Sequence, residues 1–145
     1  MNTAQSDWKP ISGGCQCGAV RYTVHAPVEL TNHCHCSMCR RMQGAIFGTW
    51  SRMEARQLTI DKGEENLTLY ESSPPVRRRF CRTCGCPLFY EHEEEPGLIW
   101  ITTATLDGGA HPGHPKERER HVWVESKVSW YEITDALPQS RDYTF

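Results

Sequence analysis

The spacing of the eight cysteines constrains the fold of this chain more than any other feature of its sequence. Cys15 and Cys17 form a C-x-C pair, and Cys81 and Cys84 form a C-x-x-C pair that is followed by Gly85. Side chains two residues apart on a strand point to one face, and a glycine after the last cysteine allows a positive φ. Together the two pairs supply four thiolates, the usual ligands of a closed structural zinc site. We therefore expect a metal ion to join the start of the chain to its middle.

A second group of cysteines lies in HCHCSMCRR, residues 33–41. Cys34 and Cys36 share a face by the same two-residue rule, and Cys36 and Cys39 share one if a helix begins there. Three thiolates can then meet at one ion, with a fourth position left for water, a substrate or a distant side chain. Three protein ligands and an open position are typical of catalytic rather than structural zinc. A substrate thiol is a natural fourth ligand, because a metal ion that binds three thiolates also favours a further soft sulfur ligand.

Other uses of these thiols are possible from the sequence alone. Cys86, in CGCPLF, can supply a fourth thiolate to the three-cysteine group, although such a cysteine is more often a small buried residue. His33 and His35 flank that group and can also ligate an ion. Some of the cysteines can instead be free and buried. Disulfides are not expected, because MNTAQSDWKP does not resemble a signal peptide and we expect the chain in the reducing cytoplasm.

The overall composition is that of an ordinary globular protein. The chain has 145 residues, of which 38% are hydrophobic and 23% charged, enough for one domain with one core. Its net charge of −2 gives no general electrostatic reason to bind nucleic acid or an anionic membrane. No run of apolar residues is long enough to predict a transmembrane helix. We therefore expect neither a nucleic-acid nor a membrane partner.

Short runs with alternating apolar residues predict a β-rich fold. GAVRYTV places Val20, Tyr22 and Val24 on one face, and further runs are rich in β-branched and aromatic residues. These runs are AIFGTW, QLTI, LTLY, RRRF, PLFYEH, LIWITT, HVWV and KVSWYEI. Turn signals such as Pro74-Pro75 separate them, which predicts an all-β sandwich or a barrel-like fold.

Two segments depart from this alternation. Residues 36–44 have helical character and end at Gly44, which leaves room for two turns at most. Residues 106–120, LDGGAHPGHPKERER, have no apolar periodicity and contain two X-Pro steps. They predict a long surface loop, which is either a solvated connector or a lid over a site. The arginines at 77–79 are expected on an exposed strand face rather than at an anion site.

Four stretches of the chain carry a resemblance to a known family. GGCQCGAVRY, CHCSMCRR, FCRTCGCPLF and HVWVESKVSWYEITDALP resemble the glutathione-dependent formaldehyde-activating enzyme family, which also includes centromere protein V-like proteins. The resemblance covers about Ser12 to Pro138, and all the cysteine spacings match in order. It implies a mainly β, Mss4-like fold stapled by zinc. The single domain would span 12–138, with an N-terminal arm at 1–11 and a C-terminal tail at 139–145.

The resemblance also implies two zinc ions per chain. The family's structural ligands match Cys15, Cys17, Cys81 and Cys84. Its catalytic ligands match Cys34, Cys36 and Cys39, whose ion we expect to be the more labile. The family's type reaction joins formaldehyde and glutathione to S-(hydroxymethyl)glutathione and is classed as a carbon–sulfur lyase reaction. A thiol such as glutathione and a small aldehyde are therefore the expected substrates, although Cys86 and the loop at 106–120 depart from the family pattern.

Several residues are candidates for contact with such substrates. The cations that can meet the carboxylates of glutathione are Arg40, Arg41, His121 and Lys127. Trp50, Trp123 and Trp130 are candidates to line a cleft, although core packing is the commoner role of such residues. Two other functions compete with the enzyme: a thiol-binding or glutathione-binding module without catalysis, and a zinc-stapled interaction domain. An open ligand position on the metal would favour the enzyme or the thiol-binding module over the interaction domain.

Overall fold

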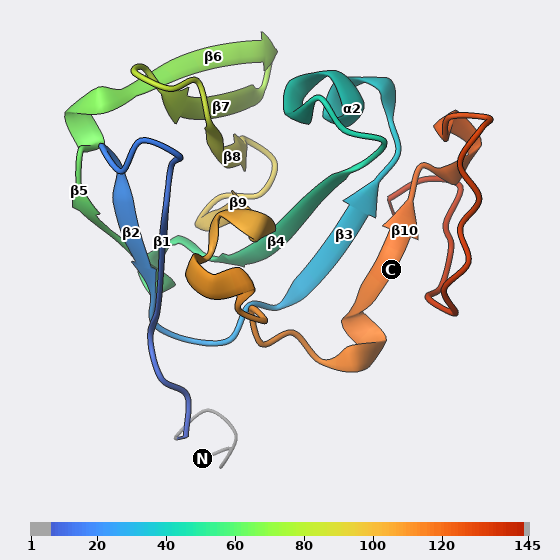
Figure 1. Ribbon diagram of the computed structural model, residues 1–145, viewed down its shortest axis with the longest axis horizontal. Coiled ribbons are helices and arrows are strands. Elements are labelled where there is room, and N and C mark those ends of the chain that lie inside the picture. Colours follow the sequence, from blue (N-terminus) through green and yellow to red (C-terminus); the bar gives the residue numbers. More distant parts are fainter. Residues whose placement is uncertain (1–6, 144–145) are drawn as a thin grey trace.

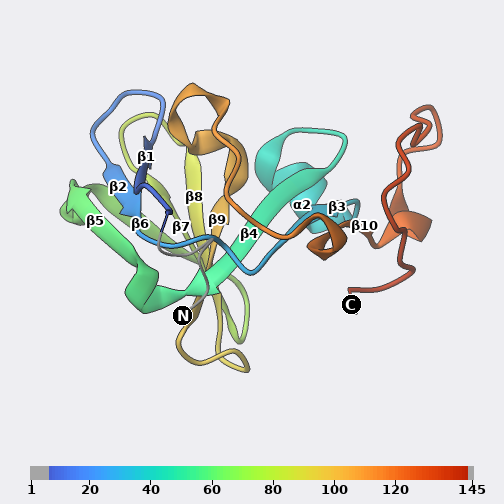
Figure 2. The same cartoon turned by 90° about the horizontal axis from the view of Figure 1, so that it is seen from below.

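Two β-sheets form the framework of the protein, which is described here by a computed structural model for residues 7–143 (Figure 1). The smaller sheet has the strand order β1–β2–β5, with β1 at Ile11–Gly14, β2 at Arg21–Val24 and β5 at Leu58–Lys62. Its strands are antiparallel to their neighbours. The smaller sheet lies at one end of the molecule, and α2, β3 and β10 lie at the other (Figure 2).

The larger sheet has seven strands in the order β10–β3–β4–β9–β8–β7–β6. In that order they span Glu119–Val122, Leu30–Cys34, Gly48–Glu54, Leu98–Thr102, Pro87–His92, Val76–Cys81 and Leu67–Ser73. β10 runs parallel to β3, and every other pair of neighbours in this sheet is antiparallel. The mainly β prediction is confirmed.

The main core lies between the two sheets. Val20, Tyr22 and Val24 are buried on one face, as the alternation predicted, and pack with residues of the larger sheet such as Phe89. The Tyr22 ring meets the Phe89 ring edge-on at 5.5 Å, and its hydroxyl lies 2.7 Å from Thr105 Oγ1. A buried tyrosine is therefore both packed and hydrogen-bonded.

The opposite face of the larger sheet carries a second apolar cluster. On β9, Ile99 and Ile101 point to the main core, whereas Trp100 between them belongs to the second cluster. This cluster also includes Trp50 of β4 and Cys34 at the end of β3. The pleat of the sheet thus separates the packing core from the face on which three of the cysteines lie.

One short α-helix, α2 (Ser37–Gln43), occurs among residues 7–143. Its N-cap is Cys36, whose side chain accepts a hydrogen bond from the backbone N–H of Cys39. Its C-cap is Gly44 with a φ of +59°, a conformation that favours glycine. The helix predicted between Cys36 and Gly44 is confirmed in position and in length.

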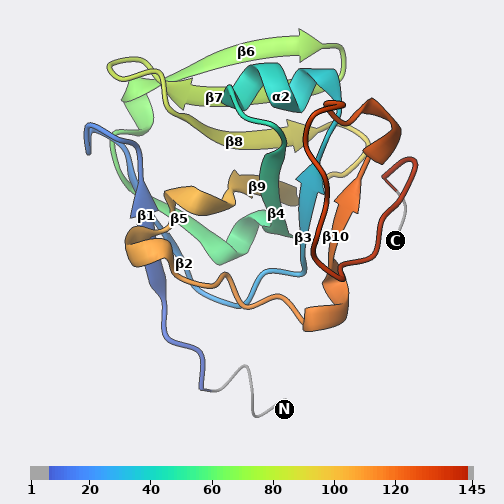
Figure 3. The ribbon, with the colours of Figure 1, turned by 45° about the vertical axis from the view of Figure 1, so that its right-hand side comes forward.

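The prediction of a strand in KVSWYEI, residues 127–133, was wrong. This segment is irregular and lies beside β10 (Figure 3). The residues after it are joined to β10 by an isolated bridge between His121 and Gln139 and by a hydrogen bond between the His121 and Asp135 side chains. The Lys127 amine donates to the backbone carbonyls of Val128 and Tyr131, so local polar contacts replace a strand ladder. Its alternating aromatic pattern does not reflect burial, since Trp130 is 75% exposed.

The remaining segments bear on the other predictions. The long loop continues from Leu106 to Arg118 with short 3-10 turns at Asp107–Gly109 and Lys116–Arg118, and β10 begins directly after it. Of the predicted terminal segments, residues 1–6 and 144–145 lie outside the described residues. Between residues 7 and 143, the structure contains no helix with the length and apolar character needed to span a membrane.

Candidate metal centres and the adjoining pocket

The four-cysteine group joins two hairpins that are far apart in the sequence. Cys15 and Cys17 lie in the turn between β1 and β2, Cys81 ends β7, and Cys84 lies in the turn that leads to β8. The four sulfurs all lie within 4.8 Å of one another. The group therefore brings the small sheet together with the far half of the large one, where the sequence predicts that a metal ion joins them.

The distances within this group fit a tetrahedral metal site. The Cys17 sulfur is 3.7 Å from that of Cys15 and 3.7 Å from that of Cys81. An ion about 2.3 Å from four tetrahedral sulfurs leaves them about 3.8 Å apart. A disulfide would need a separation of about 2.05 Å, and all eight cysteines, which lie within the described residues, are free.

Polar N–H groups point at these sulfurs, as bound thiolates require. The Val20 backbone N–H and the Asn66 side-chain amide each lie 3.3 Å from a sulfur, of Cys15 and Cys81 respectively. The turns that present the sulfurs need glycine, because Gly18 has a φ of +80° and Gly85 a φ of +77°. The expected positive φ after the last cysteine is therefore present.

The three-cysteine group is local and lies where β3 passes into α2. Cys34 ends β3, Cys36 caps the helix and Cys39 lies in its first turn. Their sulfurs lie within 4.8 Å of one another, and the Cys39 backbone N–H lies 3.3 Å from the Cys36 sulfur. Cys34 and Cys39 are buried and Cys36 is half-buried, so the group opens to one side. This donor set fits a soft metal ion with three protein ligands.

Hydrogen bonds among the three thiols shift the pKa values of Cys34 and Cys36 in opposite directions. The bonds from Cys34 and from Cys39 hold the pKa of the Cys36 thiol well below its ordinary value. The pKa of the Cys34 thiol is raised, first by its hydrogen bond to Cys36, then by its hydrogen bond to Cys39, and then by burial. Hydrogen bonds from its two neighbours thus stabilise the thiolate form of Cys36.

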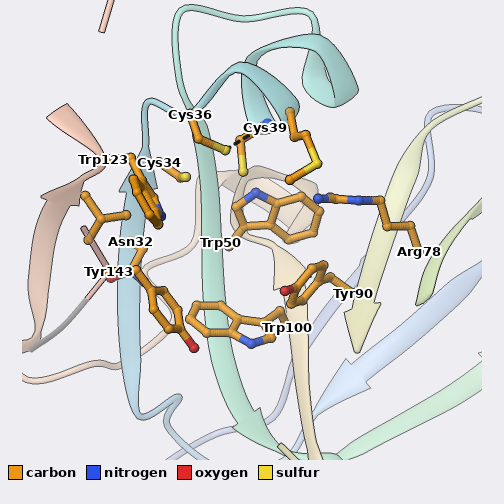
Figure 4. A pocket seen from close by; sticks show the side chains of 12 residues that line it. Asn32, Cys34, Cys36, Cys39, Trp50, Arg78, Tyr90, Trp100, Trp123 and Tyr143 are labelled. Atoms are coloured by element: carbon orange, nitrogen blue, oxygen red, sulfur yellow. Dashed lines mark hydrogen bonds between the residues drawn. The ribbon is translucent and has the colours of Figure 1, made fainter. Parts of the chain in front are cut away.

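A pocket of about 140 Å³ lies directly against the three-cysteine group (Figure 4). Aromatic residues are the largest class in its walls, which also hold one cation and one amide. The lining residues are Asn32, Cys34, Cys36, Met38, Cys39, Trp50, Arg78, Tyr90, Trp100, Val122, Trp123 and Tyr143. In Figure 4 the three sulfurs form one end of this space, and the rings of Trp50, Tyr90, Trp100 and Tyr143 surround the rest. A ligand in the pocket would therefore touch the cysteines at one end.

Three buried polar atoms that belong to lining residues have no hydrogen-bond partner in the described part of the chain. They are Asn32 Oδ1, Trp50 Nε1 and Arg78 Nη1. Buried polar atoms are normally paired, so these three are available to a ligand. Two of them are donors and one is an acceptor.

Arg78 is the functional candidate that sequence reasoning missed. It is 5% exposed, its Nε donates to Ser72 Oγ at 3.0 Å, and its guanidinium lies 5.0 Å above the Tyr90 ring. Arg77 and Arg79, its neighbours on β7, instead both pair with Glu91. The period-two alternation of the strand was the signal, because it sends the middle arginine of the run to the other face.

The other cations proposed from the sequence lie outside the pocket lining. His121 is 1% exposed and lies between His35 and Asp135, at 2.8 Å and 2.9 Å. Arg40 Nε donates to the His35 carbonyl at 3.2 Å, Arg41 is exposed on α2, and the Lys127 amine bonds backbone carbonyls.

The predicted aromatic residues divide between the pocket and the surface. Trp50 and Trp123 line the pocket. Trp130 lies outside the lining and is one of the most exposed hydrophobic residues of the described chain. The pocket instead gains Tyr90, Trp100 and Tyr143, which the sequence reading did not single out.

The alternative fourth ligands lie away from the three-cysteine group. His33 bonds Thr49 and Glu119, and His35 bonds His121, so both rings have other partners. Cys34, between them at the end of β3, faces the pocket, whereas the His33 and His35 rings both pack against the His121 ring. Cys86 packs at the edge of the main core, and its thiol lies 3.6 Å from the Pro87 carbonyl.

Two sheets joined by one cysteine group, with a second group at a pocket, define a mainly β protein with two candidate metal centres. The chain belongs to the glutathione-dependent formaldehyde-activating enzyme family, whose model matches residues 10–126. The resemblance seen in the sequence is therefore confirmed, and with it the single-domain, Mss4-like fold.

Individual relatives agree with this assignment. A protein from Halomonas elongata, provisionally named as a glutathione-dependent formaldehyde-activating enzyme, is 28% identical over 130 residues, 85% of this chain and 80% of the relative. A protein of the same name from Fusarium vanettenii is 29% identical over 101 residues, 64% of this chain and 54% of the relative. A crystal structure of a Rhodobacter sphaeroides protein is similar with a TM-score of 0.56 and 32% identity, covering 70% of this chain and 92% of that one.

Proposed function

We propose that this protein is a zinc-dependent carbon–sulfur lyase that adds the thiol of glutathione to formaldehyde or a related small aldehyde. The observation that carries the proposal is the convergence of three cysteine sulfurs on one end of a pocket that also holds unpaired buried donors. Family membership supports the same reaction class. The product would be S-(hydroxymethyl)glutathione or its analogue.

Two zinc ions fit the two cysteine groups in this proposal. Cys15, Cys17, Cys81 and Cys84 would hold the structural ion, and Cys34, Cys36 and Cys39 would hold the second. Zinc at the three-cysteine group would lower the pKa of an incoming thiol, so that the thiolate is present at neutral pH. The aromatic walls would narrow the space around the reacting atoms and favour close approach of thiol and aldehyde.

Arg78 and Trp50 would act on the aldehyde. As the thiolate sulfur bonds to the aldehyde carbon, the π electron pair of the C=O bond moves to the oxygen, which gains negative charge. Arg78 Nη1 and Trp50 Nε1 are donors without other partners and can bond that oxygen. Donors placed where charge develops stabilise a transition state more than a ground state. The proton that the thiol released to solvent on becoming a thiolate then returns to this oxygen through water at the open side of the pocket, which completes the hydroxymethyl group.

The pocket is too small to enclose a whole tripeptide. Sites that bury drug-sized ligands hold roughly 300–1,000 Å³, and this pocket holds about 140 Å³. The cysteinyl end of glutathione would enter, and its carboxylates would lie at the rim. Arg40 and Arg41 of α2 remain our candidates for those carboxylates, whereas the internal bonds of His121 and Lys127 make direct contact a weaker proposal.

Exchange NMR between formaldehyde hydrate and S-(hydroxymethyl)glutathione tests this function. The wild-type protein should raise the exchange rate above the spontaneous rate, and Cys36→Ser should return it to the spontaneous value. Cys86→Ser is the matched control, because this cysteine lies outside both groups, and it should keep the wild-type rate. Equal rates with wild type and Cys36→Ser would reject the enzyme and favour a thiol-binding module.

A further inference from the structure

A third cluster of metal-ligating side chains lies away from the cysteines. It consists of His111 and His114, in the loop after β9, and Glu119 at the start of β10. One ligand atom from each residue lies within 4.8 Å of the other two. We propose that these residues bind one divalent transition-metal ion. This site is independent of the proposed lyase activity, and it gives a role to a loop that the reaction does not use.

His114 is held as a buried metal ligand is usually held. Its residue is 6% exposed, its Nε2 lies 2.7 Å from Glu119 Oε1, and its Nδ1 lies 2.8 Å from Thr31 Oγ1. The Thr31 hydroxyl continues through Ser51 to Thr103, with 2.7 Å between successive oxygens. Hydroxyl hydrogens can rotate, so Thr31 Oγ1 can accept a hydrogen bond from Nδ1–H. An ion at Nε2 would take the place of the proton that Nε2 otherwise donates to Glu119, while the ring stays fixed from behind.

Glu119 is oriented by a second chain of hydrogen bonds. Its Oε1 faces His114, and its Oε2 lies 3.1 Å from His33 Nε2. His33 is in turn held by Thr49, whose Oγ1 lies 2.9 Å from Nδ1. One carboxylate oxygen is therefore directed at the cluster, and the other is occupied by a positioning histidine.

His111 is the member of the cluster that can move. It is exposed, its ring centroid lies 4.4 Å from that of His114, and its Nδ1 accepts a hydrogen bond from the Gly113 N–H at 3.0 Å. Ligands about 2.1 Å from a tetrahedral ion lie about 3.4 Å apart. The cluster must therefore tighten around an ion, and an exposed ring can give up one surface bond and turn to do so. The same ion would separate His114 from Glu119 slightly.

The donor set indicates the kind of ion. Two imidazole nitrogens and one carboxylate oxygen suit Zn²⁺, Co²⁺, Ni²⁺ or Fe²⁺ better than Ca²⁺ or Mg²⁺, which prefer oxygen alone. Three protein ligands leave at least one position for water. The absence of sulfur distinguishes this site from both cysteine groups, and that difference provides a spectroscopic signature.

Cobalt titration of the full-length protein, already loaded with zinc at its cysteines, tests the proposal. Native mass spectrometry should show one further metal ion per chain, and the Co²⁺ spectrum should lack the charge-transfer band that thiolate ligands produce. His111→Ala and Glu119→Gln should each weaken this binding by about 100-fold, and His33→Gln by about 10-fold, since it removes only an orienting bond. His25→Ala, which removes a histidine outside the cluster, should bind like wild type.

Two results would overturn the proposal. One is a wild-type protein that takes up no further ion, or takes it up with thiolate charge transfer. The other is a His111→Ala/Glu119→Gln double variant that binds the further ion as tightly as wild type. Because His111 is exposed, its replacement should leave the fold intact, and a circular dichroism spectrum of each variant verifies this.

Discussion

The two cysteine groups use the same side chain for different purposes. The four-cysteine group draws its sulfurs from two hairpins, with Cys17 and Cys81 64 residues apart in the sequence. The three-cysteine group comes from one connection, between β3 and α2, and forms one end of a pocket. A metal ion that joins cysteines far apart in the sequence closes a long loop and restricts the unfolded chain. Its binding free energy therefore adds to the stability of the fold. A local group contributes little in that way, and its position at a pocket favours a role toward ligands.

Cys81→Ser should produce the largest difference between the two groups. It removes a buried member of the long-range group, and metal binding by such groups supplies on the order of 10 kcal/mol of folding free energy. We expect the variant to lose its cooperative thermal transition by circular dichroism. Cys36→Ser, the matched change in the local group, should keep a melting temperature within a few degrees of wild type. A Cys81→Ser protein as stable as Cys36→Ser would contradict the division.

A chelator should separate the two groups next. Zinc held by four sulfurs that link two hairpins should leave only when the chain opens, whereas zinc held by three sulfurs at a pocket is accessible from one side. With a colorimetric chelator we expect two kinetic phases that differ by about 100-fold or more, the faster of which is missing in Cys36→Ser. Release of both ions in one phase would remove the kinetic distinction between the groups.

Arg78→Met should affect only the pocket beside the three-cysteine group. The change removes an unpaired donor and keeps an apolar stem of similar length over Tyr90. Loss of one donor to a developing oxyanion typically costs about 100-fold or more in rate, so we expect the enzyme-dependent exchange to fall by about 100-fold. Arg56→Met, which removes a positive charge from an exposed side chain outside the pocket lining, is the control. Equal rates for the two variants would show that Arg78 does not contact the reacting oxygen.

Mild acid should have the smallest effect on folding stability, and it acts through His35, which lies between Cys34 and Cys36 in the sequence. Burial, and then repulsion from His121, lowers the pKa of His35 to about 4. The unfolded chain, with an ordinary histidine pKa near 6.5, binds this proton first, so folding stability falls as the pH drops from about 6.5 toward 4. The loss through His35 should be about 2 kcal/mol at pH 5.

Denaturant titrations of wild type and His35→Asn between pH 7.5 and pH 5 measure this effect. The variant is expected to be less stable at neutral pH, but its stability should depend less on pH. Metal loss in acid affects both proteins and is removed by taking the difference. Parallel curves for the two proteins would refute the assignment to His35.

Much of the site could be predicted because its parts are close in the sequence or repeat a known spacing. C-x-C, C-x-x-C-G and the helix of Cys36 to Gly44 are short-range patterns, and chain geometry alone relates their side chains. The buried face of Val20, Tyr22 and Val24 follows from the same reasoning. The irregular segment at 127–133 shows the limit of alternation, because a pattern of side chains does not provide a strand partner for the backbone.

The sequence by itself determined the two groups of cysteines that can ligate a metal, the mainly β class and the family. Only the tertiary structure decided which groups share a space. It sends Arg78 to the pocket and its two neighbours to Glu91, and it brings His114 beside Glu119. It also buries His121 between His35 and Asp135. The reason is physical: local spacing sets the direction of a side chain, whereas its surroundings depend on strand pairings across long and variable separations along the chain.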